Sequence, residues 1–254
     1  MKIAIAGASG TIGKRVLSSA QAAGYQTVEL SRAGGVDLTS AGGVAGRLEG
    51  VDALIDVTST GSLSAKVAVA FFESVTDNLL AAERLAGVPH HVALSIIGAA
   101  NADSGYYAGK GAQERKVMTS GDQWSLLRTT QFHEFAEQTV NRGAVAGIQF
   151  VPTMRSQPIA AAEVAAELVR IATDGPIGLA PDLAGPLEEN MPDMVRRYLR
   201  ARGRKTAVLS VPLPGAMGAA MRNGGLLPTP GTRLGVQTFQ QWLDTGGEAS
   251  GSPR

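Results

Sequence analysis

Residues 1–16 read MKIAIAGASGTIGKRV, in which an apolar run leads into a glycine-rich turn and then into a second apolar pattern. The isoleucines of Lys2–Ala6 predict a short buried strand. Beyond the turn, Ile12, Val16 and Leu17 are spaced as on one face of a helix. The stretch therefore predicts a strand, a tight turn and a helix in immediate succession, which is how a parallel α/β sheet begins.

Three glycines shape this turn, at Gly7, Gly10 and Gly13. In such a turn one glycine permits the tight bend, one lets the backbone approach a pyrophosphate, and one lets helix and strand pack closely. Backbone N–H groups and the positive end of the helix dipole then converge where a phosphate can bind. Because the glycines follow a strand and precede a helix, we predict that they bind the pyrophosphate of a nicotinamide dinucleotide. The predicted cofactor-binding turn also includes Ser9, Thr11 and Ile12.

The end of the second predicted strand indicates which dinucleotide is bound. About 20 residues beyond the glycine turn, NAD-binding folds place an acidic residue against the ribose, whereas an arginine accommodates the 2′-phosphate of NADP. This chain has Ser31 and Arg32 there, while Glu29 falls on the strand, too early for the ribose. A guanidinium can bind a phosphate through two parallel N–H groups. We therefore expect NADP(H) rather than NAD(H), the alternative being that Arg32 is a solvated loop residue.

Short β-branched runs alternate with longer helical patterns through the first 150 residues. This alternation is typical of βαβ units and predicts an α/β fold with a doubly wound parallel sheet, the Rossmann fold. One helix is expected over residues 64–86, with a buried stripe that includes Val67, Phe71 and Val75 and an end at Gly87. Strands are predicted over Lys2–Ala6, 27–31, 53–57, His91–Ile96 and 125–128.

After Gly147 the pattern becomes less regular, because prolines divide it into short pieces. The elements predicted there are an extended segment over 148–151 and helices over 162–173 and 191–202. We therefore expect a dinucleotide-binding core over 1–150 and a small C-terminal substrate lobe over 151–244. Ligands of such sheets bind outside the carboxyl ends of the strands, so the lobe is expected to form the substrate wall. Residues 245–254, rich in Gly and Ser, are expected to be a disordered tail.

The composition narrows the classes of partner and of site. With 23 basic and 22 acidic residues the net charge is +1, which gives no overall field to attract nucleic acid or an anionic membrane. The chain has no cysteine, which excludes disulfides, thiolate zinc sites and cysteine nucleophiles and fits a reducing compartment. We expect a cytoplasmic monomer or homodimer that acts on a small-molecule substrate, with no nucleic-acid, membrane or metal partner.

The histidines are weak candidates for a site. His90 and His91 open a predicted strand, where neighbouring side chains point to opposite faces, so they are not expected to share a metal ion. His133 follows the end of another strand. It either lines a substrate cleft or has a structural role at the start of a helix.

Several motifs resemble the short-chain dehydrogenase/reductase superfamily and, within it, the atypical NmrA-like NAD(P)H-binding branch. They are GASGTIG at Gly7, LSR at Leu30, GVDALIDVTS at Gly50, HHVALSIIG at His90, YYAGKGAQE at Tyr106, WSLLRTTQFHEFAEQ at Trp124 and QPIAAAEVA at Gln157. The resemblance implies that segments following the strands flank the adenine and run along the cofactor toward the nicotinamide. The cofactor-binding residues that it implies are Asp37, Leu38, Val57, Thr58, Ser59 and, near the nicotinamide, Thr129.

Catalytic members of this superfamily use a serine at a strand end and a Tyr-x-x-x-Lys on the next helix, which Ser95, Tyr106 and Lys110 resemble. A hydride moved to a carbonyl leaves an alkoxide, and a tyrosine can protonate it if the tyrosine pKa is lowered from about 10. The lysine ammonium favours the phenolate and also reaches the nicotinamide ribose, while the serine orients the carbonyl. Tyr107 is an alternative acid. Because nearby glycines weaken a helix, the tyrosine is expected on a loop.

Two functions are consistent with these residues. The first is an NADPH-dependent oxidoreductase that reduces a carbonyl or a quinone, the latter reaction needing positioning more than a dedicated acid. The second is a non-catalytic NAD(P)-binding redox sensor or regulatory protein of NmrA type. In that case Tyr106 and Tyr107 pack as a hydrophobic lid and Lys110 serves only as a ribose ligand.

Overall fold

The computed structural model describes residues 1–40, 42–44 and 46–247, and they form two compact units. The first unit comprises Met1–Arg128 and Ala162–Pro181, and the second comprises Thr129–Ala161 and residues 182–247. The predicted boundary at residue 150 differs from this division, because the chain leaves the first unit earlier and later returns to it. Within the described ranges, no helix combines the length and the apolar composition needed to cross a membrane.

A parallel β-sheet forms the centre of the first unit. Its strands are β1 (Lys2–Ala6), β2 (Gln26–Leu30), β3 (Ala53–Asp56), β4 (His91–Ile96), β5 (Trp124–Thr129) and β8 (Gly178–Leu179). They are ordered β8, β5, β4, β3, β1, β2, so that the order reverses between β1 and β3. This is the doubly wound Rossmann sheet that the sequence predicts, and its reversal point is where such sheets bind ligands.

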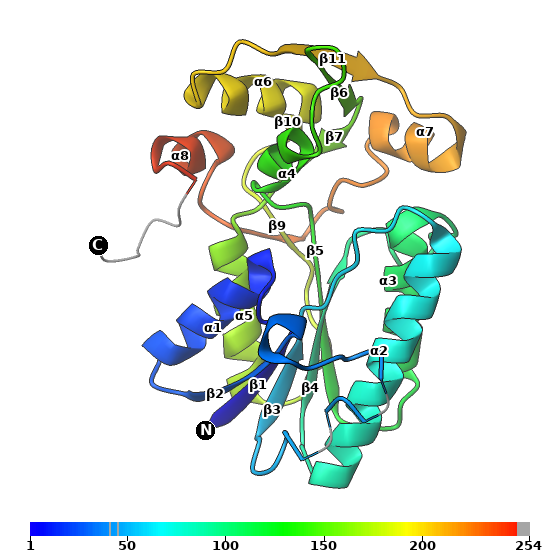
Figure 1. Cartoon of the computed structure of the whole chain (residues 1–254), viewed down its shortest axis with the longest axis vertical. Coiled ribbons are helices and arrows are strands. Elements are labelled where there is room, and N and C mark those ends of the chain that lie inside the picture. The colour runs from blue at the N-terminus through cyan, green and yellow to red at the C-terminus, as the bar shows by residue number, and fades with distance from the viewer. Residues whose placement is uncertain (41, 45, 248–254) are drawn as a thin grey trace. The chain divides into compact units, whose positions relative to one another are not determined.

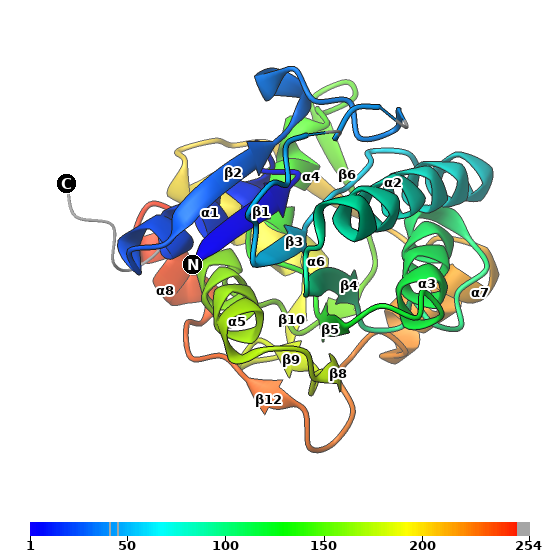
Figure 2. The same cartoon turned by 90° about the horizontal axis from the view of Figure 1, so that it is seen from below.

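Helices cover both faces of this sheet. They are α1 (Thr11–Ala22), α2 (Ala65–Ala86), α3 (Gly105–Met118) and α5 (Ala161–Asp174), with a short 3₁₀ helix, η1 (Arg32–Gly34). Figure 1 and Figure 2 show α1 and α5 on one face and α2 and α3 on the other. The first unit is therefore a three-layered α/β/α arrangement, in which the carboxyl ends of the strands lie at one edge.

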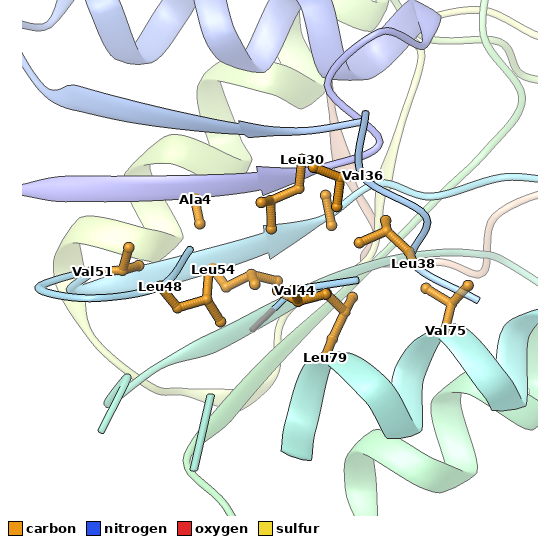
Figure 3. Packing of buried hydrophobic residues seen from close by; sticks show 11 residues of the cluster. Ala4, Leu30, Val36, Leu38, Val44, Leu48, Val51, Leu54, Val75 and Leu79 are labelled. Carbon is orange, nitrogen blue, oxygen red and sulfur yellow. The ribbon is translucent and has the colours of Figure 1, made fainter. Parts of the chain in front are cut away.

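The buried face of helix α2 is rotated about the helix axis relative to the predicted buried stripe, which included Val67 and Phe71. Val67 is 53% exposed, whereas Ala68 and Phe72 are fully buried. Val75 and Leu79 do point inward, and Figure 3 shows them in one apolar cluster with the segment that follows η1. The members of that segment in the cluster are Val36, Leu38, Val44, Leu48 and Val51.

Glycine lets α3 approach α2 closely. A Cβ atom on Gly109 would lie 2.7 Å from Cδ2 of Phe72 and 2.8 Å from the carbonyl carbon of Ala68. The prediction that these glycines leave the tyrosine on a loop is wrong, because α3 begins at Gly105 and Tyr106 lies in its first turn. The cost of glycine to helix propensity is offset by the packing that the missing Cβ permits.

The second unit is built from short elements. Its helices are α4 (Phe135–Asn141), α6 (Met191–Ala201), α7 (Gly215–Asn223) and α8 (Phe239–Asp244), and its strands are β6 (Ile148–Pro152), β7 (Arg155–Ser156), β9 (Leu183–Ala184), β10 (Glu189–Asn190), β11 (Ala207–Val211) and β12 (Arg233–Leu234). The strands form the pairs β6/β11, β7/β10 and β9/β12. Of the predicted tail, residues 248–254 lie outside the described residues. Gly246 and Gly247, predicted as disordered, donate backbone hydrogen bonds to the end of α8.

Candidate functional site

The register of three strands brings the predicted cofactor-binding segments together. Ala6, the last residue of β1, pairs with Leu30 on one side and with Asp56 on the other. The next residue, Gly7, donates its N–H to the carbonyl of Leu30 at 2.9 Å, and Val57 donates its N–H to the carbonyl of Ala6 at 3.0 Å. The glycine turn, the end of β2 and the start of the 57–59 segment therefore meet at one sheet edge.

The structure assigns a different role to each glycine of the turn. Gly7 has a φ of +86°, which favours glycine, and a Cβ there would lie 2.9 Å from the carbonyl oxygen of Val57. A Cβ on Gly13 would lie 2.7 Å from Cα of Ala8 and would also collide with the carbonyl of Gly7. Gly10 is exposed, and its Cβ would meet only Gly7 O, at 3.3 Å. Gly10 is therefore the glycine whose replacement would disturb the fold least.

The start of α1 fits a dinucleotide pyrophosphate. Gly10 is its N-cap residue, and in this part of the described chain neither a side-chain cap nor an acidic residue occupies the first turn. Ser9, Gly10 and Thr11 are exposed, while Ile12 anchors the helix in the core. Unsatisfied N–H groups at a helix start attract anions. The helix therefore presents donors and a positive dipole end to a phosphate.

Arg32 is carried on η1 directly after β2. Buried Ser31 caps this short helix, since its Oγ accepts a hydrogen bond from the N–H of Gly34 at 3.3 Å. The exposed Arg32 lines a cavity of 420 Å³ together with Asp37. The hydroxyl and N–H of Thr39 hydrogen-bond the Asp37 carboxylate, which lowers the Asp37 pKa with a smaller contribution from the charge of Arg32. A cation and a fixed carboxylate therefore border one cavity.

The segment after β3 lies between the glycine turn and α3. Thr58 is buried, donates its N–H to Asp56 at 2.9 Å, and accepts a hydrogen bond from Lys110 Nζ at 3.4 Å. Among the described residues, the Thr58 hydroxyl oxygen has no hydrogen-bond partner. Ser59 is exposed, and its Oγ lies 3.3 Å from the hydroxyl of Tyr106. This pair connects the predicted cofactor segment to the predicted acid.

The pKa of Tyr106 is shifted upward, whereas the pKa of an activated tyrosine acid would be shifted downward. Burial raises its pKa to about 12, against a smaller lowering by the hydrogen bond between its hydroxyl and that of Ser59. Its ring packs edge-on against Phe72 and Tyr107, with centroid distances of 5.6 and 6.5 Å. Both tyrosines therefore belong to an aromatic cluster on α2 and α3, and only the hydroxyl of Tyr106 faces Ser59 in these contacts.

Lys110 is buried behind this cluster. Its ammonium donates to the carbonyls of Leu94, at 2.8 Å, and Thr58, and to the side-chain oxygen of Gln113, at 2.8 Å. These three acceptors match its three N–H donors. Burial lowers the Lys110 pKa to about 8, although the charges of Asp56 and Glu114 oppose the change. Lys110 can therefore reach a ribose only by giving up one of these bonds.

Ser95 is held by a network that the motifs did not predict. Its hydroxyl donates to Glu114 at 2.6 Å, and Arg128 binds the same carboxylate through two N–H groups at 2.9 and 2.6 Å. Ser95 is only 3% exposed, so the orienting role predicted for it would require this hydroxyl to turn away from Glu114. A second carboxylate, that of Asp56, accepts a hydrogen bond from Gln113 at 2.7 Å.

The remaining predicted residues lie away from this cluster or in the second unit. His90 bonds Ser125 at 2.8 Å and His91 bonds Glu83 at 2.9 Å, which confirms that the two rings face different neighbours. His133 is fully buried in the second unit, donates from Nε2 to the carbonyl of Gln237 at 2.9 Å, and has a pKa lowered to about 4 by burial. Its contacts are structural. Thr129 belongs to the second unit, so its contact with the nicotinamide stays a prediction.

No protein-family model matches this sequence, and no curated protein matches it. Solved structures share its fold. An NADPH-dependent quinone oxidoreductase from Escherichia coli aligns over 97% of this chain and 100% of its own, with a TM-score of 0.67 and 16% identity. A dTDP-4-dehydrorhamnose reductase from Clostridium acetobutylicum aligns over 97% of this chain and 93% of its own, with a TM-score of 0.68 and 16% identity. A dTDP-glucose 4,6-dehydratase from Streptomyces venezuelae, with NAD bound, aligns over 90% of this chain and 92% of its own, with a TM-score of 0.65 and 18% identity.

Proposed function

We propose that this chain is an NADPH-dependent oxidoreductase that transfers a hydride to a small carbonyl or quinone. The register of β1, β2 and β3 carries the proposal, because it gathers the glycine turn, Arg32 and the 57–59 segment at one sheet edge. Tyr106 and Lys110 contact that segment from α3. The shared fold with an NADPH-dependent quinone oxidoreductase supports the same assignment.

In this proposal, one set of residues binds the cofactor and another transfers the proton. The start of α1 binds the pyrophosphate and Arg32 binds the 2′-phosphate. A bound NADPH supplies the hydride, and reduction of a carbonyl also takes up one proton at its oxygen. With a pKa of about 12, the hydroxyl of Tyr106 holds its proton at neutral pH and can donate it to a stronger base such as an alkoxide. Ser59 orients that hydroxyl.

Within this class the site favours a quinone over a ketone. The pKa of Tyr106 is raised, which makes it a weaker acid than an activated tyrosine. The Lys110 ammonium can donate a proton to a substrate only after it gives up one of its three acceptors. Hydride transfer to a quinone depends mainly on holding the two reactants in line. We therefore infer that a quinone is reduced faster than an aldehyde or a ketone.

Single-turnover oxidation of bound NADPH tests this function. We expect the absorbance of NADPH at 340 nm to decay on mixing with a quinone, and more slowly or not at all with aldehydes and ketones. Tyr106→Phe should leave the quinone rate within about threefold, because positioning and not protonation limits that reaction. Tyr107→Phe is the matched control. Tight binding of NADPH without oxidation by any of these substrates would contradict the proposal.

A non-catalytic redox sensor is the second candidate, and the same contacts favour it. Ser95 is held by Glu114, and Tyr106 packs with Tyr107 and Phe72. A protein of this kind would bind NADPH and NADP⁺ with different affinities and would not convert one into the other. The single-turnover experiment distinguishes the two candidates directly.

Cofactor preference is expected to depend on Arg32. Wild-type protein should bind NADPH at least about tenfold more tightly than NADH, since hydrogen bonds to a charged group contribute roughly 1.5–3 kcal/mol. Arg32→Asp should reverse the order, because a carboxylate repels the 2′-phosphate and accepts from the ribose hydroxyls. Fluorescence titration of both dinucleotides measures this. Arg47→Asp, an exposed arginine of the same connection, is the control for net charge, and equal wild-type affinities would show that Arg32 does not bind the phosphate.

A further inference from the structure

The strands β6 and β11 pair in parallel in the second unit, and α6 packs against both of them (Figure 1). Side chains alternate between the two faces of a strand, so the buried Gln149 and Val151 share the face that the helices cover. Gln149 also donates from Nε2 to the carbonyl of Thr139 in α4, at 3.0 Å. Phe150 therefore points to the opposite face, where it is 45% exposed.

This opposite face of the strand pair is apolar along its whole length. Residues in register lie on the same face of a parallel pair, which puts Leu209 beside Phe150. Leu209 is 50% exposed. The other members of this face are apolar as well and are exposed or half-buried: Ile148, Pro152, Ala207 and Val211. We call this set the apolar face, and contiguous exposed patches of this kind mark interaction surfaces.

A tight turn extends the apolar face at the start of β6. Val145 and Ile148 exchange backbone hydrogen bonds of 3.0 and 2.9 Å, which closes a two-residue hairpin turn between them. Both central residues have a positive φ, of 49° at Ala146 and 77° at Gly147, and Ala146 is the one non-glycine with such a φ in the described chain. An alanine in this conformation is strained. The turn holds Val145 outward, where it is 67% exposed.

Three basic side chains lie at the same end of the strand pair. Strands β6 and β11 are parallel and each follows a helix, so the last residues of α4 and α6 lead to the same end. Arg142 follows α4, and Arg204 and Lys205 lie between α6 and β11. All three are exposed, and none of them forms an ion pair with another residue that the structure describes. We call these three residues the basic cluster.

The acidic side chains at α6 do not neutralise the basic cluster. Asp193 lies in the first turn of α6 and pairs with Arg196, while Glu189 precedes the helix and pairs with Arg197. Both carboxylates therefore belong to the opposite end of α6 and already have partners. A basic cluster beside an exposed apolar face is the combination by which proteins bind the surface of an anionic bilayer.

We propose that the apolar face and the basic cluster together bind an anionic lipid bilayer. Val145, Phe150 and Leu209 enter the interface, and the basic cluster contacts the phospholipid headgroups. A second copy of the chain docked through the apolar face brings it no carboxylate, because every residue of that face is uncharged. The expectation of no membrane partner rested on the net charge of +1, whereas such binding depends on the charges near the bilayer. This inference does not depend on the proposed function.

Co-sedimentation of the full chain with lipid vesicles tests the proposal. We expect binding to phosphatidylcholine vesicles that contain about 30% phosphatidylserine, little binding to phosphatidylcholine alone, and weaker binding as salt is added. Arg204→Glu with Lys205→Glu should weaken binding at least about 25-fold, since each basic residue near such a surface contributes about fivefold. Arg47→Glu with Lys66→Glu, which changes two exposed residues of the first unit, is the control for net charge.

A fluorescent label on the apolar face gives a second measurement that does not depend on the charge reversal. The chain has no cysteine, so Phe150→Cys can carry a single polarity-sensitive fluorophore. We expect its emission to increase and shift to shorter wavelength when phosphatidylserine vesicles are added. The same label at Val67→Cys, an exposed position of α2, should not respond.

Three results would overturn the proposal. The first is wild-type protein that stays in solution with both kinds of vesicle. The second is vesicle binding that neither the charge reversal nor the label at residue 150 detects. The third is protein that ignores vesicles and sediments as a dimer that Phe150→Ser separates, which assigns the apolar face to a second copy. None of them changes the proposed function, which the oxidation of NADPH tests separately.

Discussion

Replacing Gly10 with alanine is expected to weaken NADPH binding about a hundredfold while leaving the fold intact. The added Cβ would meet only Gly7 O, at 3.3 Å, so the turn has to shift by only a few tenths of an ångström to accept it. A pyrophosphate that accepts hydrogen bonds from the start of α1 must approach this residue. Losing two hydrogen bonds to a charged phosphate costs about 1.5 kcal/mol each, which is roughly a hundredfold in affinity.

Gly13→Ala is the variant to compare with it. Its Cβ would lie 2.7 Å from Cα of Ala8, so we expect a lower melting temperature even without ligand. Gly10→Ala should lower the melting temperature of the free protein much less than Gly13→Ala does, and should lose the increase that NADPH produces. Calorimetric melting with and without NADPH measures both effects. Wild-type affinity in Gly10→Ala would place the phosphate elsewhere.

Glu83→Ala is expected to cause the largest loss of stability. Glu83 and His91 form an ion pair in which both side chains are at most 5% exposed, with Nδ1 2.9 Å from one carboxylate oxygen. Removing one partner of a buried pair leaves the other charge unpaired, which costs about 3 kcal/mol or more. Urea denaturation measures the free energy of unfolding. Arg84→Ala, which breaks the neighbouring exposed pair with Asp122, should have little effect.

The loss in Glu83→Ala should depend on pH. Burial tends to lower the His91 pKa, but the charge and hydrogen bond of Glu83 outweigh it, so that the pKa lies above the ordinary value of 6.5. A group whose pKa is raised by folding contributes its full stability below the unfolded pKa and loses it as the pH rises through the folded one. The difference between wild type and Glu83→Ala should therefore be largest below pH 6.5 and shrink above it. A difference that grows with pH would contradict a protonated His91.

The local patterns of the first unit were enough to predict its sheet and its glycine turn. The predicted strands Lys2–Ala6 and His91–Ile96 match the structure, because a buried parallel strand leaves a continuous apolar run bounded by polar or glycine residues. The glycine spacing identified the turn, but it did not show which steric requirement each glycine meets. That assignment depends on contacts with Val57 and Ala8, which pairing in space creates.

The polar network of α3 could not be predicted from the same patterns. Residues 108–114 are all buried, so this helix shows no alternation between an apolar and a polar face. Gln113 and Glu114 read as surface residues until their partners Asp56 and Arg128 are known, and those come from β3 and β5. Ser95 and Lys110 were identified by resemblance, whereas their actual partners are a matter of tertiary packing.

The close contact at Gly109 has a mechanical consequence. Because only a hydrogen atom separates α3 from Phe72 and Ala68 there, the two helices cannot slide or tilt independently without a steric clash. Helix α2 carries Phe72 and Ala68, and α3 carries Tyr106 and Lys110. The positions of the Tyr106 hydroxyl and the Lys110 ammonium relative to α2 are therefore set by helix packing, so these two groups cannot shift along α2 without breaking the contact at Gly109.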